Sequence, residues 1–154
     1  MAVRYTVSRQ MKYDRDYVLC ECELEPLAEF VKALEQRHHI SIVKDPSVCL
    51  AMIRAEDSLE KQEFYLGEAL TTECEVAVDG ALGYGVCLGE EPVRGYCLAV
   101  IDALLHGSNA QPGSAYAEIE DFIEHQGRIV SENQVREFNL TLRTQVDFKL
   151  MEQE

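Results

Sequence analysis

Between residues 40 and 88, hydrophobic side chains recur mostly at every second position, which is the period of a β-strand. The alternation predicts strands at 40–43, 48–56, 63–70, 72–79 and 82–88. Asp79-Gly80 separates the last two, and a tight type I′ hairpin turn needs positive φ at both central residues, which Asp tolerates and Gly adopts freely. We therefore expect 72–79 and 82–88 to pair as antiparallel strands.

Segment 48–56 is apolar on both faces. Alternation places Cys49, Ala51, Ile53 and Ala55 on one face and Val48, Leu50 and Met52 on the other. A strand with two apolar faces is typical of the centre of a sheet, where both faces are covered. The pattern predicts that 48–56 is a central strand.

Helical spacing appears on both sides of these strands. One helix is predicted from Glu25-Pro26 and a second over 91–107, with apolar stripes Leu27, Phe30, Val31 and Leu34, and Val93, Cys97, Val100, Ile101 and Leu104. A less regular helix is expected over 8–22. After the Gly/Ser/Pro-rich segment 107–114, Ser114 begins a further helix, with a break near Gly127 and a continuation over 131–143. Alternation at 146–151 predicts a terminal strand.

Glycines give one face of segment 82–88 almost no side chains. Gly83, Gly85 and Cys87 share that face, so something must pack very close to it, and helix 91–107 is the expected neighbour. The spacing G-x-G-x-x-x-G within a strand does not match the dinucleotide-binding pattern, which lies at a strand-to-helix turn. Close helix packing explains these glycines better than nucleotide binding.

Together these elements predict an α+β fold: a mainly antiparallel sheet of about four to five strands packed by helices. A chain of 154 residues fits one domain, 1–154, with a core at about 17–107 and a C-terminal helical arm and strand at about 114–151. No apolar run approaches the roughly 18 residues that span a bilayer, and no secretory signal is visible. We expect a cytoplasmic protein.

The net charge of −14, from 28 acidic and 14 basic residues, disfavours nucleic acids and anionic membranes as partners. The N-terminal residues Arg4, Arg9, Lys12 and Arg15 form a basic cluster that could dock an anion or an acidic partner, or simply be a solvated end. Six cysteines at mostly apolar-face positions are expected to be free thiols. No cofactor is predicted.

The sequence shows no recognisable group of catalytic or metal-binding residues. Cys20-x-Cys22 with His38-His39 lacks the paired spacing of structural zinc sites, and no nucleophile motif is present. Asp102 stands out as a charge within the apolar run V-I-D-A-L-L, although a residue on the polar face of a helix or an ion-pair partner explains it more simply. The pattern favours a subunit that works with partners, and the catalytic residues stay unknown.

Four motifs carry a family resemblance: F-Y-L-G-E-A at 64–69, V-A-V-D-G-A-L-G-Y at 76–84, C-L-A-V-I-D-A-L-L at 97–105 and V-D-F at 146–148. Together they resemble the G subunit of the bacterial carbon-phosphorus lyase core complex. The resemblance implies a soluble assembly with H, I and J subunits, two copies of each, that degrades alkylphosphonates. With its neighbours, such a subunit helps to form a ribose 1-phosphonate 5-triphosphate from ATP and a phosphonate, releasing adenine, and is not catalytic alone.

The motif positions Asp79, Gly80, Gly83 and Asp102 carry no role that the resemblance assigns. Val146, Asp147 and Phe148 are expected to bind a partner, since a late strand on a helical arm often pairs with another chain. Gln145 stands where the family usually has Arg; if that Arg anchors a partner acid or a phosphate, this chain has lost the contact. The alternative is a free-standing small-molecule-binding or regulatory α+β module, suggested by the glycine strip.

Overall fold

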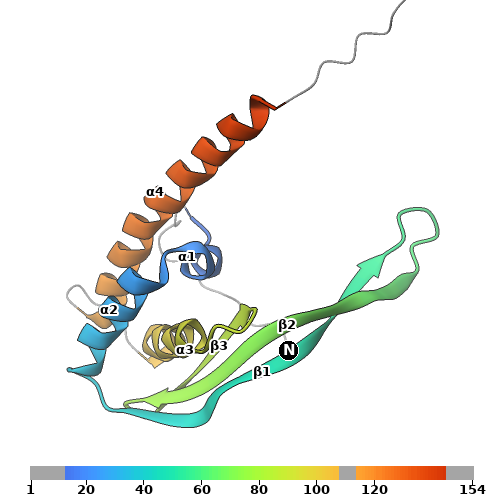
Figure 1. Ribbon diagram of the computed structural model, residues 1–154. Helices are drawn as coiled ribbons and strands as arrows, with labels where there is room; N and C mark the ends of the chain where they lie inside the picture. The colour runs from blue at the N-terminus through green and yellow to red at the C-terminus, as the bar shows by residue number, and fades with distance from the viewer. Residues whose placement is uncertain (1–12, 108–113, 145–154) are drawn as a thin grey trace, which may run out of the picture.

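The computed structural model describes residues 13–107 and 114–144. Within them the chain forms, in order, α1 (Arg15–Glu21), α2 (Leu24–Glu35), β1 (Ile40–Glu56), β2 (Glu63–Val78), β3 (Ala81–Leu88), α3 (Pro92–Gly107) and α4 (Ala115–Leu142). The strands form an antiparallel sheet in the order β1-β2-β3. Helix α3 packs on this sheet, and α1, α2 and α4 lie beyond α3 (Figure 1). The expected α+β class is confirmed.

The described sheet has three strands, fewer than the four to five expected. Segments 40–43 and 48–56 belong to one continuous strand, β1, and segments 63–70 and 72–78 both belong to β2, with Asp79 in the turn that follows. At Asp45-Pro46 the chain does not turn back; β1 passes it through register shifts at Ile42/Lys44 and Lys44/Ser47. A bulged edge strand tolerates Pro there, since the missing N–H is not needed by a neighbour. The predicted strand 146–151 lies outside the described residues.

The central position predicted for segment 48–56 is wrong, because β1 is an edge strand. Strand β3 pairs with β2 only from Thr71 to Val78. From Leu50↔Leu70 to Glu56↔Glu63, β1 and β2 pair with each other alone. These residues, 50–70, project away from the core as a two-stranded extension that we call the hairpin arm (Figure 1).

The predicted turn and the glycine strip are both confirmed. Asp79 and Gly80 have φ values of 50° and 87°, the two positive values that the turn requires. A Cβ on Gly83 would lie 2.2 Å from the carbonyl oxygen of Ala99, and one on Gly85 would lie 2.0 Å from that of Gly95. Helix α3 therefore approaches β3 to backbone contact, which a side chain on either glycine would prevent.

The last helix differs from its prediction because α4 is continuous across Gly127. A Cβ on Gly127 would lie 2.5 Å from Cδ2 of Tyr13, so this glycine makes room for a ring rather than ending the helix. Helix α1 is shorter than the predicted 8–22: its N-cap is Asp14, whose carboxylate accepts the N–H of Tyr17 at 3.1 Å. Residues 8–12 lie outside the described part.

The core lies between the sheet and the helices. It is built from Val76 and Val78 of β2, the inner stripes of α2 and α3, and Ile119 and Ile123 of α4. All six cysteines are free, and four of them, Cys22, Cys74, Cys87 and Cys97, are buried. Burial raises the pKa of the Cys97 thiol to about 11, so it is a packing residue at neutral pH. Within the described residues, no helix combines the length and the apolar composition needed to span a bilayer.

Candidate partner-binding surface

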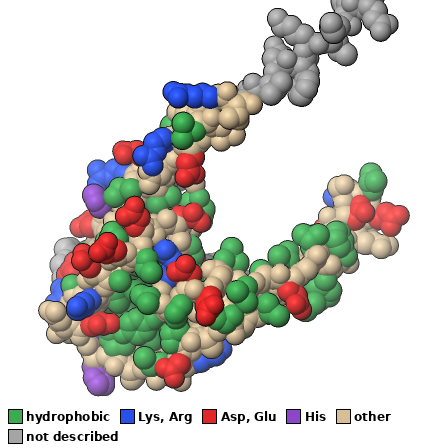
Figure 2. Space-filling model, in the orientation of Figure 1, with side chains coloured by type: hydrophobic (Ala, Val, Ile, Leu, Met, Phe, Trp, Pro, Cys, Tyr) green, Lys and Arg blue, Asp and Glu red, His purple; other side chains and the backbone are tan. Residues whose placement is uncertain are grey.

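Exposed apolar side chains cover both faces of the hairpin arm. Successive residues of a strand point to opposite faces, so Met52 and Ile53, which are 59% and 43% exposed, lie on opposite sides. The large apolar side chains exposed along the two strands of the arm are Leu50, Met52, Ile53, Phe64, Tyr65, Leu66 and Leu70. Figure 2 shows hydrophobic side chains along this projection. An exposed apolar surface of this kind is typical of a site that another molecule covers.

A second apolar stripe lies on the face of β3 that points away from α3. It alternates with the glycines and consists of Leu82, Tyr84, Val86 and Leu88. Leu88 pairs with Thr71, the first residue of β2 after the arm. The stripe therefore ends at the base of the arm, and the two surfaces can contact one partner.

The outer half of α4 is also apolar and exposed, at Val135, Phe138, Leu140 and Leu142. Helix α4 and the hairpin arm leave the core in different directions, and a wide hollow lies between them (Figure 2). Both segments that extend from the core thus expose large hydrophobic side chains. This arrangement is suited to holding a large neighbour rather than a small ligand.

The hairpin arm has an acidic excess. It contains five acidic residues, Glu56, Asp57, Glu60, Glu63 and Glu68, against two basic residues, for a net charge of −3. Both basic residues are in ion pairs within the arm, Arg54 with Glu63 at 3.0 Å and Lys61 with Glu56 at 3.5 Å. A molecule that covers the arm therefore meets apolar faces with an acidic rim.

Asp79 fastens the β2–β3 turn to the segment that precedes β1. Its Oδ1 accepts the backbone N–H of His39 at 2.9 Å, and its Oδ2 lies 2.6 Å from Nδ1 of His38. Its own N–H donates to the carbonyl of His39 at 2.9 Å. The hydrogen bonds from His38 and His39 lower the pKa of the Asp79 carboxyl group. Gly80 completes the same turn, so both motif positions have structural contacts.

Asp102 fastens α3 to β3. Its Oδ2 accepts the backbone N–H of Tyr84 at 2.9 Å, and its Oδ1 lies 3.1 Å from Nδ1 of His106 one turn later. Gly83 lies beneath the same helix, against Ala99 and Ala103. The contacts of these motif positions are with the chain itself. Gln145, Val146, Asp147 and Phe148 lie outside the described residues.

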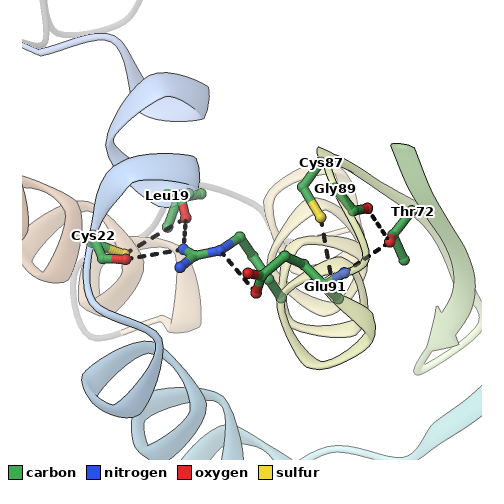
Figure 3. A network of polar contacts seen from close by, with 7 residues as sticks. Leu19, Cys22, Thr72, Cys87, Gly89 and Glu91 are labelled. Atoms are coloured by element: carbon green, nitrogen blue, oxygen red, sulfur yellow. Dashed lines mark hydrogen bonds and ion pairs between the residues drawn. The ribbon is translucent and has the colours of Figure 1, made fainter. Parts of the chain in front are cut away.

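A polar network joins the end of α1 to the start of α3 (Figure 3). Arg94, with a side chain only 13% exposed, donates from Nη1 to the carbonyls of Leu19 and Cys22 at 2.9 and 3.0 Å. Carbonyls at a helix C-terminus have no partner within the helix, so Arg94 satisfies them. In the same network, Thr72 Oγ1 donates to the Gly89 carbonyl at 2.7 Å and accepts the Glu91 N–H at 2.9 Å. Arg94 is therefore committed to structure.

The thiols and histidines considered as metal ligands lie on different elements. Cys20 and Cys22 belong to α1 and its C-cap, whereas His38 and His39 precede β1, where His38 contacts Asp79. Across residues 13–107 and 114–144, no group of three or more His, Cys, Asp and Glu side chains is arranged to hold a metal ion.

Sequence reasoning missed the hairpin arm as a binding surface. The signal was visible, since 48–56 is apolar on both faces, but we interpreted it as burial within the chain's own sheet. It also missed Arg94, because a single arginine at the start of a helix gives no sign of which carbonyls it will meet.

A family model described as "Phosphonate metabolism protein PhnG" matches residues 12–153 of the chain. The chain is also 27% identical, over 135 residues, to a protein of Rhizobium meliloti (strain 1021) named "Alpha-D-ribose 1-methylphosphonate 5-triphosphate synthase subunit PhnG". The aligned region covers 87% of this chain and 83% of that relative.

Proposed function

The chain belongs to the PhnG family of phosphonate metabolism proteins, and we propose that it acts as a partner-dependent subunit of a ribose 1-methylphosphonate 5-triphosphate synthase. The resemblance drawn from its four sequence motifs is thereby confirmed at the level of the family. The observation that carries the proposal is the hairpin arm, which exposes large apolar side chains on both faces. Within residues 13–107 and 114–144 nothing covers these side chains, which favours burial by another molecule.

Burial of the arm supplies a substantial part of the free energy that assembly needs. Fully burying a large apolar side chain is worth about 1.5–3 kcal/mol, and each of the seven on the arm is roughly half exposed. Covering them therefore contributes on the order of 1 kcal/mol each, before the costs of association. A sum of this size is a substantial part of the ~8 kcal/mol that corresponds to micromolar binding.

The ion pairs of five described basic residues favour a role in assembly over one in substrate binding. A nucleoside triphosphate and a phosphonate need concentrated positive charge. Here Arg37, Lys44, Arg54, Lys61 and Arg94 each lie in an ion pair with a glutamate. With a net charge of −14, the chain repels such anions unless partners supply the cations.

In the proposed role, the chain works with H, I and J subunits, two copies of each, as the family resemblance implies. The assembly would convert ATP and an alkylphosphonate into a ribose 1-phosphonate 5-triphosphate with release of adenine. This chain contributes apolar surface and a rigid core, and the residues that contact the reacting atoms come largely from its neighbours.

The alternative of a free-standing small-molecule module rested on the glycine strip. Helix α3 fills that strip to backbone contact at Gly83 and Gly85. The glycines therefore leave no room for a ligand, and this observation does not favour the alternative.

The experiment that tests the proposal removes the hairpin arm. Leu50 and Leu70 pair directly across β1 and β2, so joining them through Asn-Gly replaces the arm with a tight turn in register. We expect this variant to keep its circular dichroism and thermal transition, because the arm lies outside the core, but to lose co-purification with H, I and J subunits. The complex should release adenine from ATP only when the full chain is present.

A matched control shortens only the tip. Joining Glu56 to Glu63 through Asn-Gly removes the connecting loop and keeps both apolar strands. This variant should assemble normally. Normal assembly of the arm-less variant, or adenine release by the isolated chain, would contradict the proposal, and micromolar binding of ATP by the isolated chain in calorimetry would favour the alternative.

A further inference from the structure

We infer that the partner adds an extended segment as a strand along the free edge of β1 between Ser47 and Ile53. This inference rests on the proposed function and specifies how the partner is held. The backbone of β1 pairs with β2 on one side, and no described strand occupies its other side. A free strand edge presents a row of unpaired N–H and C=O groups, which is a template for another strand.

The edge from Ser47 to Ile53 has none of the usual protections. Its pairing with β2 runs without a shift from Ser47↔Glu73 to Ile53↔Gly67. Natural edge strands are normally guarded by charged side chains, prolines or bulges. The seven residues S-V-C-L-A-M-I contain no charge, no Pro and no Gly. The free edge of this stretch can therefore pair with an added strand along its whole length.

The other edges of the described sheet are interrupted by charges, Pro, register shifts or an occupied N–H group. Towards its start, β1 carries Lys44 and Pro46 and two register shifts. The outer edge of β2 has Glu63 and Glu68, and a shift at Ile53/Arg54. On β3, the N–H of Tyr84 is taken by Asp102 of α3. Ser47–Ile53 differs from these edges because it combines an unshifted register with no charge, no Pro, no Gly and no N–H taken by a helix, and we place the expected contact there.

The side chains define the chemistry of the incoming segment. Leu50 and Met52 lie on one face of β1, and Ala51 and Ile53 on the other, so a strand added beside them would place its own side chains against apolar neighbours on both faces. The segment should therefore be apolar at successive positions. Its end nearest the tip of the arm should carry Lys or Arg, because Glu56 and Glu63 lie there.

Charge separates this occupant from a second copy of the same chain. Self-pairing of two β1 edges would bring together two arms of net charge −3 on chains of net charge −14. Like charges in neighbouring strands are destabilising, and the overall fields add to the repulsion. The structure therefore favours a different subunit with basic residues beside its apolar strand.

Amide hydrogen exchange tests the inference on the full chain, alone and in complex with the H, I and J subunits. Successive N–H groups of a strand point to opposite edges. In the free chain, every second amide between Ser47 and Ile53 should exchange fast. In the complex these amides should slow by about tenfold or more, the change that one hydrogen bond of about 1.4 kcal/mol produces. Unchanged exchange would overturn the inference.

Two proline variants provide a second measurement. Leu50→Pro and Ala51→Pro remove neighbouring N–H groups, one of which points to β2 and the other to the free edge. The variant that keeps the stability of the free chain should bind the partner subunits about tenfold more weakly. Leu50→Ala and Ala51→Ser keep the N–H groups and control for the side chains. If both proline variants unfold, hydrogen exchange on the unmodified chain still tests whether a partner strand pairs with the β1 edge.

The outcomes separate this inference from the proposed function. A chain that assembles, but shows neither protection at 47–53 nor a proline effect, overturns the strand addition and leaves the subunit role standing. A chain that never associates with H, I and J overturns both. Protection of the same amides in a homodimer of this chain would make a second copy the occupant and also overturn the inference.

Discussion

The carboxylate of Asp102 on α3 accepts the backbone N–H of Tyr84 on β3 at 2.9 Å. Tyr84 belongs to an edge strand, and its N–H is a donor that no strand beyond β3 takes in the described sheet. One hydrogen bond therefore does two things: it fixes the helix over the sheet and it occupies a donor on the β3 edge. Asp102, which in the sequence is an isolated charge in an apolar run, thus connects α3 to β3.

Removing this acceptor should weaken the fold measurably. Asp102→Ala leaves the Tyr84 N–H without its partner, and we expect the free energy of unfolding to fall by about 1 kcal/mol. Asp102→Asn keeps an acceptor oxygen and should lie closer to wild type. Urea denaturation followed by circular dichroism measures both. An Asp102→Ala chain of unchanged stability that abolished synthase activity in the complex would instead indicate a role in the reaction.

The glycines beneath α3 predict a sharp contrast between two substitutions of the same kind. In Gly85→Ala the new Cβ would lie 2.0 Å from the Gly95 carbonyl oxygen and 2.6 Å from the Ala99 nitrogen, both backbone atoms that cannot rotate away. Overpacking of this kind costs about 1–3 kcal/mol or more.

Gly67→Ala is the control, because nothing lies within 4 Å of its Cβ position on the hairpin arm. It should leave the thermal transition within a few degrees of wild type. Equal melting temperatures for the two variants would show that α3 can move away from β3 at little cost.

Arg94 should be more important to stability than its single charge suggests. Arg94→Ala leaves the carbonyls of Leu19 and Cys22 without their donor, and we expect a loss of about 2 kcal/mol or more in the free energy of unfolding. Arg94→Lys retains the charge but lacks the planar fork, so it should recover only part of this loss. Arg128→Ala, at an exposed position of α4, controls for the loss of a positive charge. Similar losses of unfolding free energy in Arg94→Ala and Arg128→Ala would contradict the structural role of the Arg94 hydrogen bonds.

Asp79 should contribute to stability in a way that depends on pH. Its folded-state pKa is lowered by the hydrogen bonds from His38 and His39, so its contribution is complete above the pKa of about 3.9 of an unfolded aspartate. That contribution is lost as the pH falls through the lower folded value.

Asp79→Asn tests this, because Asn also tolerates the positive φ of the turn. The stability difference between wild type and variant should be largest above about pH 5 and should shrink towards pH 2. Urea titrations at a series of pH values measure it. A difference that stays constant over this range would show that the carboxylate charge is unimportant.

Elements specified by local chemistry were predictable from the sequence. The Asp79-Gly80 turn, β3 and the bounds of α3 follow from turn residues, alternation and a regular apolar stripe. The close approach of α3 was also predictable, since Gly83 and Gly85 on one face leave space that a neighbour must fill. In each case the determinant lies within a few residues of the element.

Features decided at longer range were not predictable. The alternation at 48–56 correctly indicates a strand, but burial by the same chain and burial by another chain give the same pattern. Gly127 appeared to be a helix end because its partner, Tyr13, is more than a hundred residues away. The network of Arg94 depends on where α1 lies relative to α3, and the contact of Asp102 with Tyr84 depends on how α3 crosses β3.

The hairpin arm has a consequence for how the cell must manage this polypeptide. A newly synthesised copy without its partner subunits exposes hydrophobic side chains along the whole hairpin arm. Chaperones bind exposed surface of this kind, and proteases degrade chains that keep it exposed. We expect the steady-state amount of the chain to follow the supply of its companions rather than its own rate of synthesis. Surplus copies would be removed, so the stoichiometry of the assembly would be maintained by quality control.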